Sequence, residues 1–159
     1  MLYSILGLIV SLLLAFAAAY AGAVVSPGIA SSDWYNELRK PEWNPPTWLF
    51  GPVWTALYAM MAIAAWVVWK QHGFYEAQKA LVIYLIQLVI NAGWSWIFFG
   101  WHRLGWALVE IMLLWLFVFW TILAFSTYSL VAAWLMVPYL LWVSFAMILN
   151  ASIWRRNRA

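Results

Sequence analysis

The stretch WYNELRKPEWNPPTWLFGPVWTALY, residues 34–58, is the most informative part of this chain. It holds four of the six prolines and four of the 15 tryptophans. Prolines and flat rings make a stiff segment, because each proline fixes one backbone angle and each ring has few rotatable bonds. A mostly apolar chain of 159 residues has little soluble material to spare. We therefore interpret this first loop as a lid over a pocket between membrane helices.

The composition places the chain in a membrane. Hydrophobic residues make up 68% of it and charged residues only 8%, and a soluble domain of this size could not bury that much apolar surface. The stretches without any charged residue are 1–32, 43–69, 80–101 and 111–154. A hydrocarbon core about 30 Å thick needs roughly 20 helical residues, so the first three stretches provide one span each and the last provides two.

The predicted fold is an all-α membrane protein: a bundle of five transmembrane helices with a lid-like first loop that contains a short helix. We place a single integral membrane domain over residues 1–159. The five long helices are expected near residues 5–25, 47–70, 80–101, 105–127 and 130–154. The first could instead be a signal peptide, but it lacks a basic beginning and its apolar stretch is longer than usual for such a peptide.

The distribution of lysine and arginine predicts the orientation. Six of these residues fall on the side of the C-terminus and two on the other side. By the positive-inside rule, the C-terminus and the first loop face the cytoplasm. The basic residues are scattered or gathered at the tail, which suits lipid headgroups better than nucleic acid. The absence of a recognisable transit peptide fits a bacterial membrane.

Conventional catalytic chemistry finds little support. The chain has no cysteine, which excludes disulfide and thiolate chemistry. His72 and His102 fall in loops on opposite sides of the membrane and cannot share a metal. No paired carboxylates, nucleophile–base set or phosphate loop is present. We expect no metal site, no required cofactor and no conventional active site.

Three of the expected helices carry polar and aromatic residues on one face at membrane depth. These are Trp54 and Tyr58; Gln87, Asn91 and Trp94; and Tyr139, Trp142, Ala146 and Asn150. The spacing puts each set on a single stripe, and amide groups are costly against lipid tails, so the stripes should point inward. Hydrogen bonding between helices would explain each stripe alone. Together, beneath a stiff loop, they favour a pocket for a large planar ligand.

Glu110 is the only acidic residue inside an expected span. It lies about a turn into its helix, where the lipid headgroups and the positive end of the helix dipole could both ease its charge. A purely structural role is one interpretation. A proton-linked or ligand-contacting role is the other.

Several segments resemble the translocator protein family (TspO/MBR), whose members are also called tryptophan-rich sensory proteins or peripheral benzodiazepine receptors. The resemblance covers roughly residues 20–157. The matching residues are Trp34-Tyr35, Leu38, Lys40-Pro41, Trp43, Pro45-Pro46, Gly51-Pro52-Val53-Trp54, Leu57-Tyr58, Asn91, Trp94, Phe98-Phe99-Gly100, Gly105 through Glu110, Pro138-Tyr139-Leu140, Trp142, Phe145-Ala146, Leu149-Asn150, Trp154-Arg155 and Asn157. Six such segments in order make a specific signal.

The resemblance implies a five-helix bundle whose first loop closes a pocket. Family members bind porphyrins such as protoporphyrin IX and haem, and synthetic isoquinoline carboxamide or benzodiazepine drugs. Carried to this chain, Trp54 and Asn91 would contact the ligand by hydrogen bonding. The residues implied to line the pocket are Tyr35, Pro45, Tyr58, Trp94, Trp142, Ala146 and Asn150.

Three functions follow from these observations. The first is a tetrapyrrole-binding sensor, scavenger or translocator. The second is an enzyme for light- and oxygen-dependent porphyrin breakdown, with Trp54 and Trp142 as the candidate catalytic residues. The third is a regulatory membrane partner without a ligand, which would use exposed Trp115 and Trp120.

Two departures from the family pattern concern partners. The segment 149–155 lacks the tyrosine of the animal sterol motif, so sterol binding is not expected by that route. Some relatives form homodimers through small residues on the third long helix, where this chain has Val82 and Ile86. A homodimer is therefore expected only with a wider helix separation there.

Overall fold

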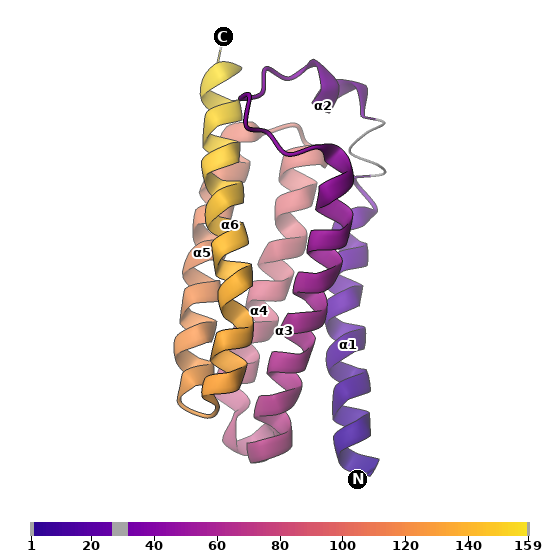
Figure 1. The fold of residues 1–159 in the computed structure, drawn as a ribbon, viewed down its shortest axis with the longest axis vertical. Helices are drawn as coiled ribbons and strands as arrows, with labels where there is room; N and C mark the ends of the chain where they lie inside the picture. Colours follow the sequence, from indigo (N-terminus) through magenta and orange to yellow (C-terminus); the bar gives the residue numbers. More distant parts are fainter. Residues whose placement is uncertain (1, 27–31, 159) are drawn as a thin grey trace.

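The expected all-α fold is confirmed. The computed structural model describes residues 2–26 and 32–158, and within them five helices are long and apolar enough to cross a membrane. These are α1 (Leu2–Ala23), α3 (Thr47–Glu76), α4 (Gln78–Ser95) with its continuation η2 (Trp96–Gly100), α5 (Leu104–Ser126) and α6 (Leu130–Arg156). A short helix, α2 (Asp33–Glu37), lies in the first loop, at the end of the bundle that also holds the C-terminus (Figure 1).

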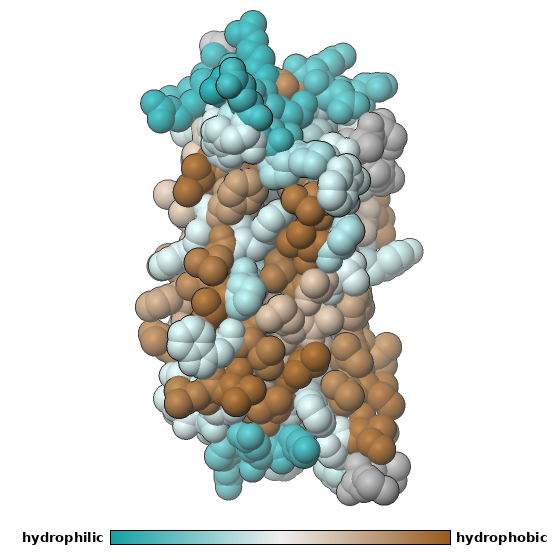
Figure 2. Space-filling model, in the orientation of Figure 1, coloured by the Kyte–Doolittle hydropathy of each residue, from teal (hydrophilic) through white to brown (hydrophobic). Residues whose placement is uncertain are grey.

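Hydrophobic residues form a broad band around the middle of the visible face, and hydrophilic residues gather at its two ends (Figure 2). This is the pattern of helices that cross a bilayer, because lipid tails accept apolar side chains and the headgroup regions accept charge. The two termini lie at opposite ends of the bundle (Figure 1), as an odd number of spans requires.

The helix ends agree with the predicted bounds to within about three residues except at the end of α3, and one further feature, at the lid end of α4, was not predicted. Helix α3 continues past residue 70 to Glu76, but Gly73 has a positive φ of 71° and breaks the helical backbone there. Glycine permits this conformation because it has no Cβ. At the lid end of α4, the backbone widens into the π-helical turn η2, in which the N–H of Trp101 donates to the carbonyl of Trp96 at 2.8 Å. Such turns are frequent at functional sites.

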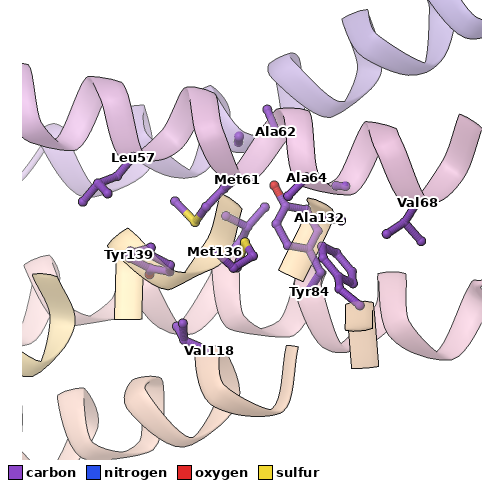
Figure 3. Packing of buried hydrophobic residues seen from close by; sticks show 14 of the residues in the cluster. Leu57, Met61, Ala62, Ala64, Val68, Tyr84, Val118, Ala132, Met136 and Tyr139 are labelled. Atoms are coloured by element: carbon purple, nitrogen blue, oxygen red, sulfur yellow. The ribbon is translucent and has the colours of Figure 1, made fainter. Parts of the chain in front are cut away.

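The helices pack as a ring. Helix α1 contacts α3 and α4, α6 contacts α3 and α5, and α4 contacts α5. Small residues on α3, such as Ala62 and Ala64, are fully buried and let neighbouring backbones approach closely. Met61, Met136 and Tyr139 meet in the centre of the bundle (Figure 3), where dispersion contacts supply the attraction that water cannot provide inside a membrane.

Indole N–H groups join several helices. Trp66 of α3 donates to the Ser4 carbonyl of α1 at 2.7 Å. Trp115, expected to be exposed toward lipid or a partner, is instead half-buried and donates to the Ser144 hydroxyl of α6 at 2.8 Å. That expectation was wrong for Trp115 because a hydroxyl acceptor on the neighbouring helix satisfies its N–H. Trp120 is exposed as expected, with 53% of its surface accessible.

Candidate functional site

A cavity of about 580 Å³ lies at the lid end of the bundle. Its walls come from α1, α3, α4, η2 and α6, together with Tyr35 of the lid. The volume falls within the range of small-molecule sites, roughly 300–1,000 Å³. Most of the wall is apolar, and its rings come from Phe16, Tyr35, Trp48, Phe50, Trp54, Tyr58, Trp94, Phe98, Phe99 and Trp142.

Seven of the nine predicted ligand-binding residues line this cavity: Tyr35, Trp54, Tyr58, Asn91, Trp94, Trp142 and Ala146. The other two lie outside its wall. Pro45 is half-buried in the first loop, where its carbonyl accepts a hydrogen bond from the Asn44 amide at 3.0 Å. Asn150 is buried and donates to the Leu104 carbonyl of α5 at 2.9 Å. The structure thus brings residues of all three predicted stripes around one space, whereas Gln87 and Tyr139 of these stripes are buried outside the wall. Ligand binding by these residues stays a prediction.

The sequence did not predict that α1 forms one wall of the cavity. Helix α1 contributes Phe16, Ala19, Gly22 and Ala23, although it carries no polar stripe at that depth. The available signal was its run of small residues. A Cβ on Gly22 would lie 3.0 Å from the Ser95 hydroxyl oxygen, so glycine at this position permits the close approach of α1 to α4.

The η2 turn supplies a second unforeseen wall, because Phe98 and Phe99 both line the cavity. Phe98 is almost fully buried, and the Trp94 ring stacks on it at 4.8 Å between centroids. A hydrophobic pattern cannot reveal a π-helical turn, since the inserted residue changes the register without changing composition.

A hydrogen-bonded chain crosses the floor of the cavity. The Tyr58 hydroxyl donates to the Asn91 side-chain oxygen at 2.9 Å, and the Asn91 side-chain nitrogen donates to the Tyr139 hydroxyl. All three residues are buried, and they come from α3, α4 and α6. Buried polar groups normally need such partners. Asn91 therefore joins three helices at the wall of the cavity.

Trp54 lies at the centre of an aromatic cluster. Its ring is 5.8 Å from Tyr58, 6.1 Å from Tyr139 and 6.4 Å from Trp142, and the two tryptophan rings are almost perpendicular at 89°. Edge-to-face contacts of this kind hold rings in defined positions. The Trp54 indole N–H makes no hydrogen bond to any described residue, so it remains available to an acceptor on a ligand.

Two other polar groups at the cavity wall are enclosed by protein. The indole N–H groups of Trp94 and Trp142 are buried without a hydrogen-bond partner among the described residues. Burying an unpaired donor is unfavourable by about 1–3 kcal/mol, and such groups are few in native proteins, so each calls for an explanation.

Tyr35 closes the cavity from the lid. Only 3% of its surface is exposed, and its ring lies 5.8 Å from that of Phe99. Its hydroxyl donates to the Asn44 side-chain oxygen at 3.3 Å, and the Lys40 ammonium lies 4.6 Å from its ring centroid. Burial raises the pKa of the Tyr35 phenol, so this ring stays neutral at physiological pH. The Ser32 hydroxyl caps α2 by accepting from the Tyr35 N–H at 3.3 Å, as N-cap serines do.

The cavity wall carries no charge. None of its described residues is aspartate, glutamate, lysine, arginine or histidine. His72 lies near the opposite end and contacts Glu76 at 3.5 Å, whereas His102 stacks on Trp34 at 4.1 Å. Within residues 2–26 and 32–158, no group of three or more metal-binding side chains comes together. The site is therefore suited to a large, uncharged and mostly apolar body.

Glu110 lies outside the cavity wall, on α5. Both carboxyl oxygens are buried without a hydrogen-bond partner in the described part of the chain. A Cβ on Gly93 of α4 would lie 3.6 Å from one of them, so the carboxyl group faces the back of α4. Its two interpretations, structural or proton-linked, both remain compatible with this position.

Comparison with known proteins identifies the family. The model of the TspO/MBR family matches residues 9–155. The chain belongs to this family. It is 45% identical to the "Tryptophan-rich protein TspO" of Chlorobaculum tepidum over 148 residues, 91% of each chain. It is 42% identical to the human "Translocator protein" over 127 residues, 78% of this chain and 75% of the relative.

A further TspO/MBR relative is the "Tryptophan-rich sensory protein" of Cereibacter sphaeroides, with 41% identity over 141 residues, 89% of this chain and 85% of the relative. Together with the five apolar helices, this membership makes the chain a multi-pass integral membrane protein. The resemblance predicted from its tryptophan and proline segments is confirmed.

Proposed function

We propose that this TspO/MBR protein binds a tetrapyrrole, protoporphyrin IX or haem, in the lidded cavity and acts as a sensor, scavenger or translocator. The observation that carries the proposal is the cavity of about 580 Å³, whose wall is aromatic and uncharged. The words "sensory" and "translocator" in the names of its relatives agree with it. Flat drugs of the benzodiazepine-receptor type would compete for the same space.

The chemistry of the wall supports a planar ligand. Indole and phenol rings offer flat faces for stacking on a macrocycle, and the unpaired Trp54 N–H offers one hydrogen bond to it. Carboxylate groups would be poorly placed inside, because no lysine, arginine or histidine is found among the described residues that line the cavity. We expect the two propionates of protoporphyrin to point toward Lys40, beside the lid residue Tyr35.

The same wall favours a porphyrin without iron. Haem iron is usually held by an axial histidine, cysteine, methionine or tyrosine. The described wall residues include no histidine, cysteine or methionine, and of its two tyrosines, Tyr58 already donates its hydroxyl to Asn91. We therefore propose protoporphyrin IX as the better ligand, with haem bound through its ring alone.

The experiment is a titration of the detergent-purified protein with protoporphyrin IX in the dark, followed by tryptophan fluorescence. We expect saturable quenching that weakens in Trp142→Phe and is unchanged in the lipid-facing control Trp120→Phe. Linear quenching that is the same in all three proteins would mean partitioning into the micelle and would rule out the proposal.

A second candidate function is light-dependent breakdown of the bound porphyrin. It is favoured by Trp54 and Trp142, whose rings lie 6.4 Å apart and both line the cavity. A photoexcited porphyrin would find two oxidisable rings beside it. Illumination of the saturated complex in air tests this function. Loss of porphyrin absorbance at equal rates in wild type, Trp54→Phe and Trp142→Phe would exclude these residues from the chemistry.

A further inference from the structure

We propose that Asn157, at the end of α6, is a positioning residue that holds the lid closed and thereby sets how fast ligands exchange with water. The proposal rests on the proposed function for its ligand. The contact between Asn157 and Arg39, which we call the latch, is a property of the free protein. The two parts that it joins are 118 residues apart along the chain.

The contact is a matched pair of hydrogen bonds. The Asn157 side-chain oxygen accepts from the Arg39 backbone N–H at 3.0 Å, and the Asn157 side-chain nitrogen donates to the Arg39 carbonyl at 3.0 Å. Both backbone groups of one lid residue are thus satisfied by one amide side chain. An amide can do this because it carries a donor and an acceptor side by side, which aspartate, serine and alanine do not.

Asn157 is itself held in place by α6. Its backbone N–H donates to the Ile153 carbonyl at 3.1 Å, and its side-chain nitrogen donates to the same carbonyl at 2.8 Å. The carbonyl groups in the last turn of a helix have no hydrogen-bond donor within the helix, so donors such as these satisfy them. The latch is therefore fixed by the point at which α6 ends.

The contacts that hold the lid differ along its length. At its beginning, the half-buried Trp34 ring stacks on His102 at 4.1 Å and contacts Phe98 edge-on at 5.7 Å. Further along, the Arg39 hydrogen bonds are exposed, and beyond them the exposed Trp43 ring contacts Phe145 of α6 edge-on at 5.9 Å. Exposed hydrogen bonds compete with water and open more readily than buried contacts. The lid should therefore open at Arg39 and swing about Trp34.

Tyr35 connects this motion to the cavity. It lies between Trp34 and Arg39, is buried, and lines the cavity wall. Lifting the Arg39 end would draw Tyr35 away from Phe98 and Phe99 and admit water. The alternative route for a ligand lies within the bilayer, past the exposed wall residue Trp48 of α3. The latch controls exchange only if the lid is the entrance.

The first test uses the free protein. The chain has no cysteine, so Ala146→Cys places a single thiol in the cavity wall. A charged, membrane-impermeant thiosulfonate should modify it slowly. Adding Asn157→Ala should raise the labelling rate about tenfold, the effect of losing one or two net hydrogen bonds. Adding Arg156→Ala, the exposed neighbour, is the matched control and should leave the rate unchanged. Equal rates in the two double variants would overturn the latch.

The second test locks the lid. In the variant Arg39→Cys/Asn157→Cys, an oxidised disulfide replaces the hydrogen bonds. We expect protoporphyrin IX to dissociate at least ten times more slowly from the oxidised than from the reduced protein. A dissociation rate that is the same in both states would show that the ligand leaves through the bilayer, and would overturn control of exchange by the lid.

The two tests separate the latch from the proposed function. If wild-type protein shows no saturable porphyrin binding while Asn157→Ala still accelerates labelling, the ligand assignment fails and the latch is supported.

Thermal unfolding of Asn157→Ala serves as the structural readout. A latch predicts nearly unchanged unfolding together with faster labelling. A general loosening of α6 would instead lower the unfolding temperature and speed labelling of the cavity thiol in the Arg156→Ala control as well, and would overturn the latch.

Discussion

At the scale of single residues, the floor of the cavity depends on one amide. Asn91 accepts from Tyr58 and donates to Tyr139, and all three side chains are buried. No other residue type of similar size offers a donor and an acceptor in those directions. A buried hydroxyl that loses its only partner carries a large desolvation penalty in a membrane interior.

We predict that Asn91→Leu destabilises the protein by about 2–3 kcal/mol, because it leaves the Tyr58 donor without an acceptor. Reversible unfolding in mixed micelles measures the effect. Val89→Ala is the control, since Val89 lies on the same helix and is 72% exposed. An equal loss of stability in both variants would contradict the role of the hydrogen-bonded chain.

Lys40 provides a residue-scale test of how a porphyrin is oriented. Its ammonium lies over the Tyr35 ring at 4.6 Å, which puts a positive charge at the edge of the cavity. We predict that Lys40→Gln weakens binding of protoporphyrin IX about threefold, as expected for a partly exposed ion pair. Binding of its dimethyl ester should not change. A similar loss for both ligands would mean that Lys40 acts through the lid and not through the propionates.

At the scale of elements, one wall of the cavity depends on the close packing of α1 on α4 at the lid end. The indole N–H of Trp96 donates to the Ala21 carbonyl at 2.9 Å, and the next residue of α1, Gly22, packs on Ser95. These contacts fasten the lid end of α1, whose inner face supplies one wall. The wall is thus placed by helix packing, with no polar side chain of α1 needed for it.

We predict that Gly22→Leu abolishes porphyrin binding and lowers stability by about 1–3 kcal/mol, because the added side chain meets Ser95 or fills the cavity. Fluorescence titration and thermal unfolding measure the two effects. Gly100→Ala is the control, since a Cβ there would make only an ordinary contact of 3.8 Å with Val25. Normal binding by Gly22→Leu would show that α1 does not form a working wall.

At the scale of the whole molecule, the charges are unequal at the two ends. The end that holds the C-terminus and the lid has six arginine and lysine residues, whereas the opposite end has two. By the positive-inside rule, this asymmetry predicts that the lid and the latch face the cytoplasm.

We predict that a cysteine at position 79 is labelled by an impermeant maleimide in intact cells, whereas one at position 158 is labelled only after permeabilisation. The variants are Lys79→Cys and Arg158→Cys, each the only thiol in the chain. The reverse pattern would place the lid outside the cytoplasm and would contradict the charge argument.

The sequence by itself determined the spans and the inward faces of α3, α4 and α6. A bilayer demands about 20 apolar residues per helix, and polar groups spaced by whole turns can only point away from lipid. Helical spacing alone therefore places Trp54, Asn91 and Trp142 on inward faces of their helices.

Only the tertiary structure decided which helices are neighbours, that α1 and η2 complete the wall, that Pro45 and Asn150 lie outside it, and that Asn157 reaches Arg39. These are pairings between distant parts of the chain. Periodicity describes one helix at a time, whereas side-chain packing between helices sets their contacts.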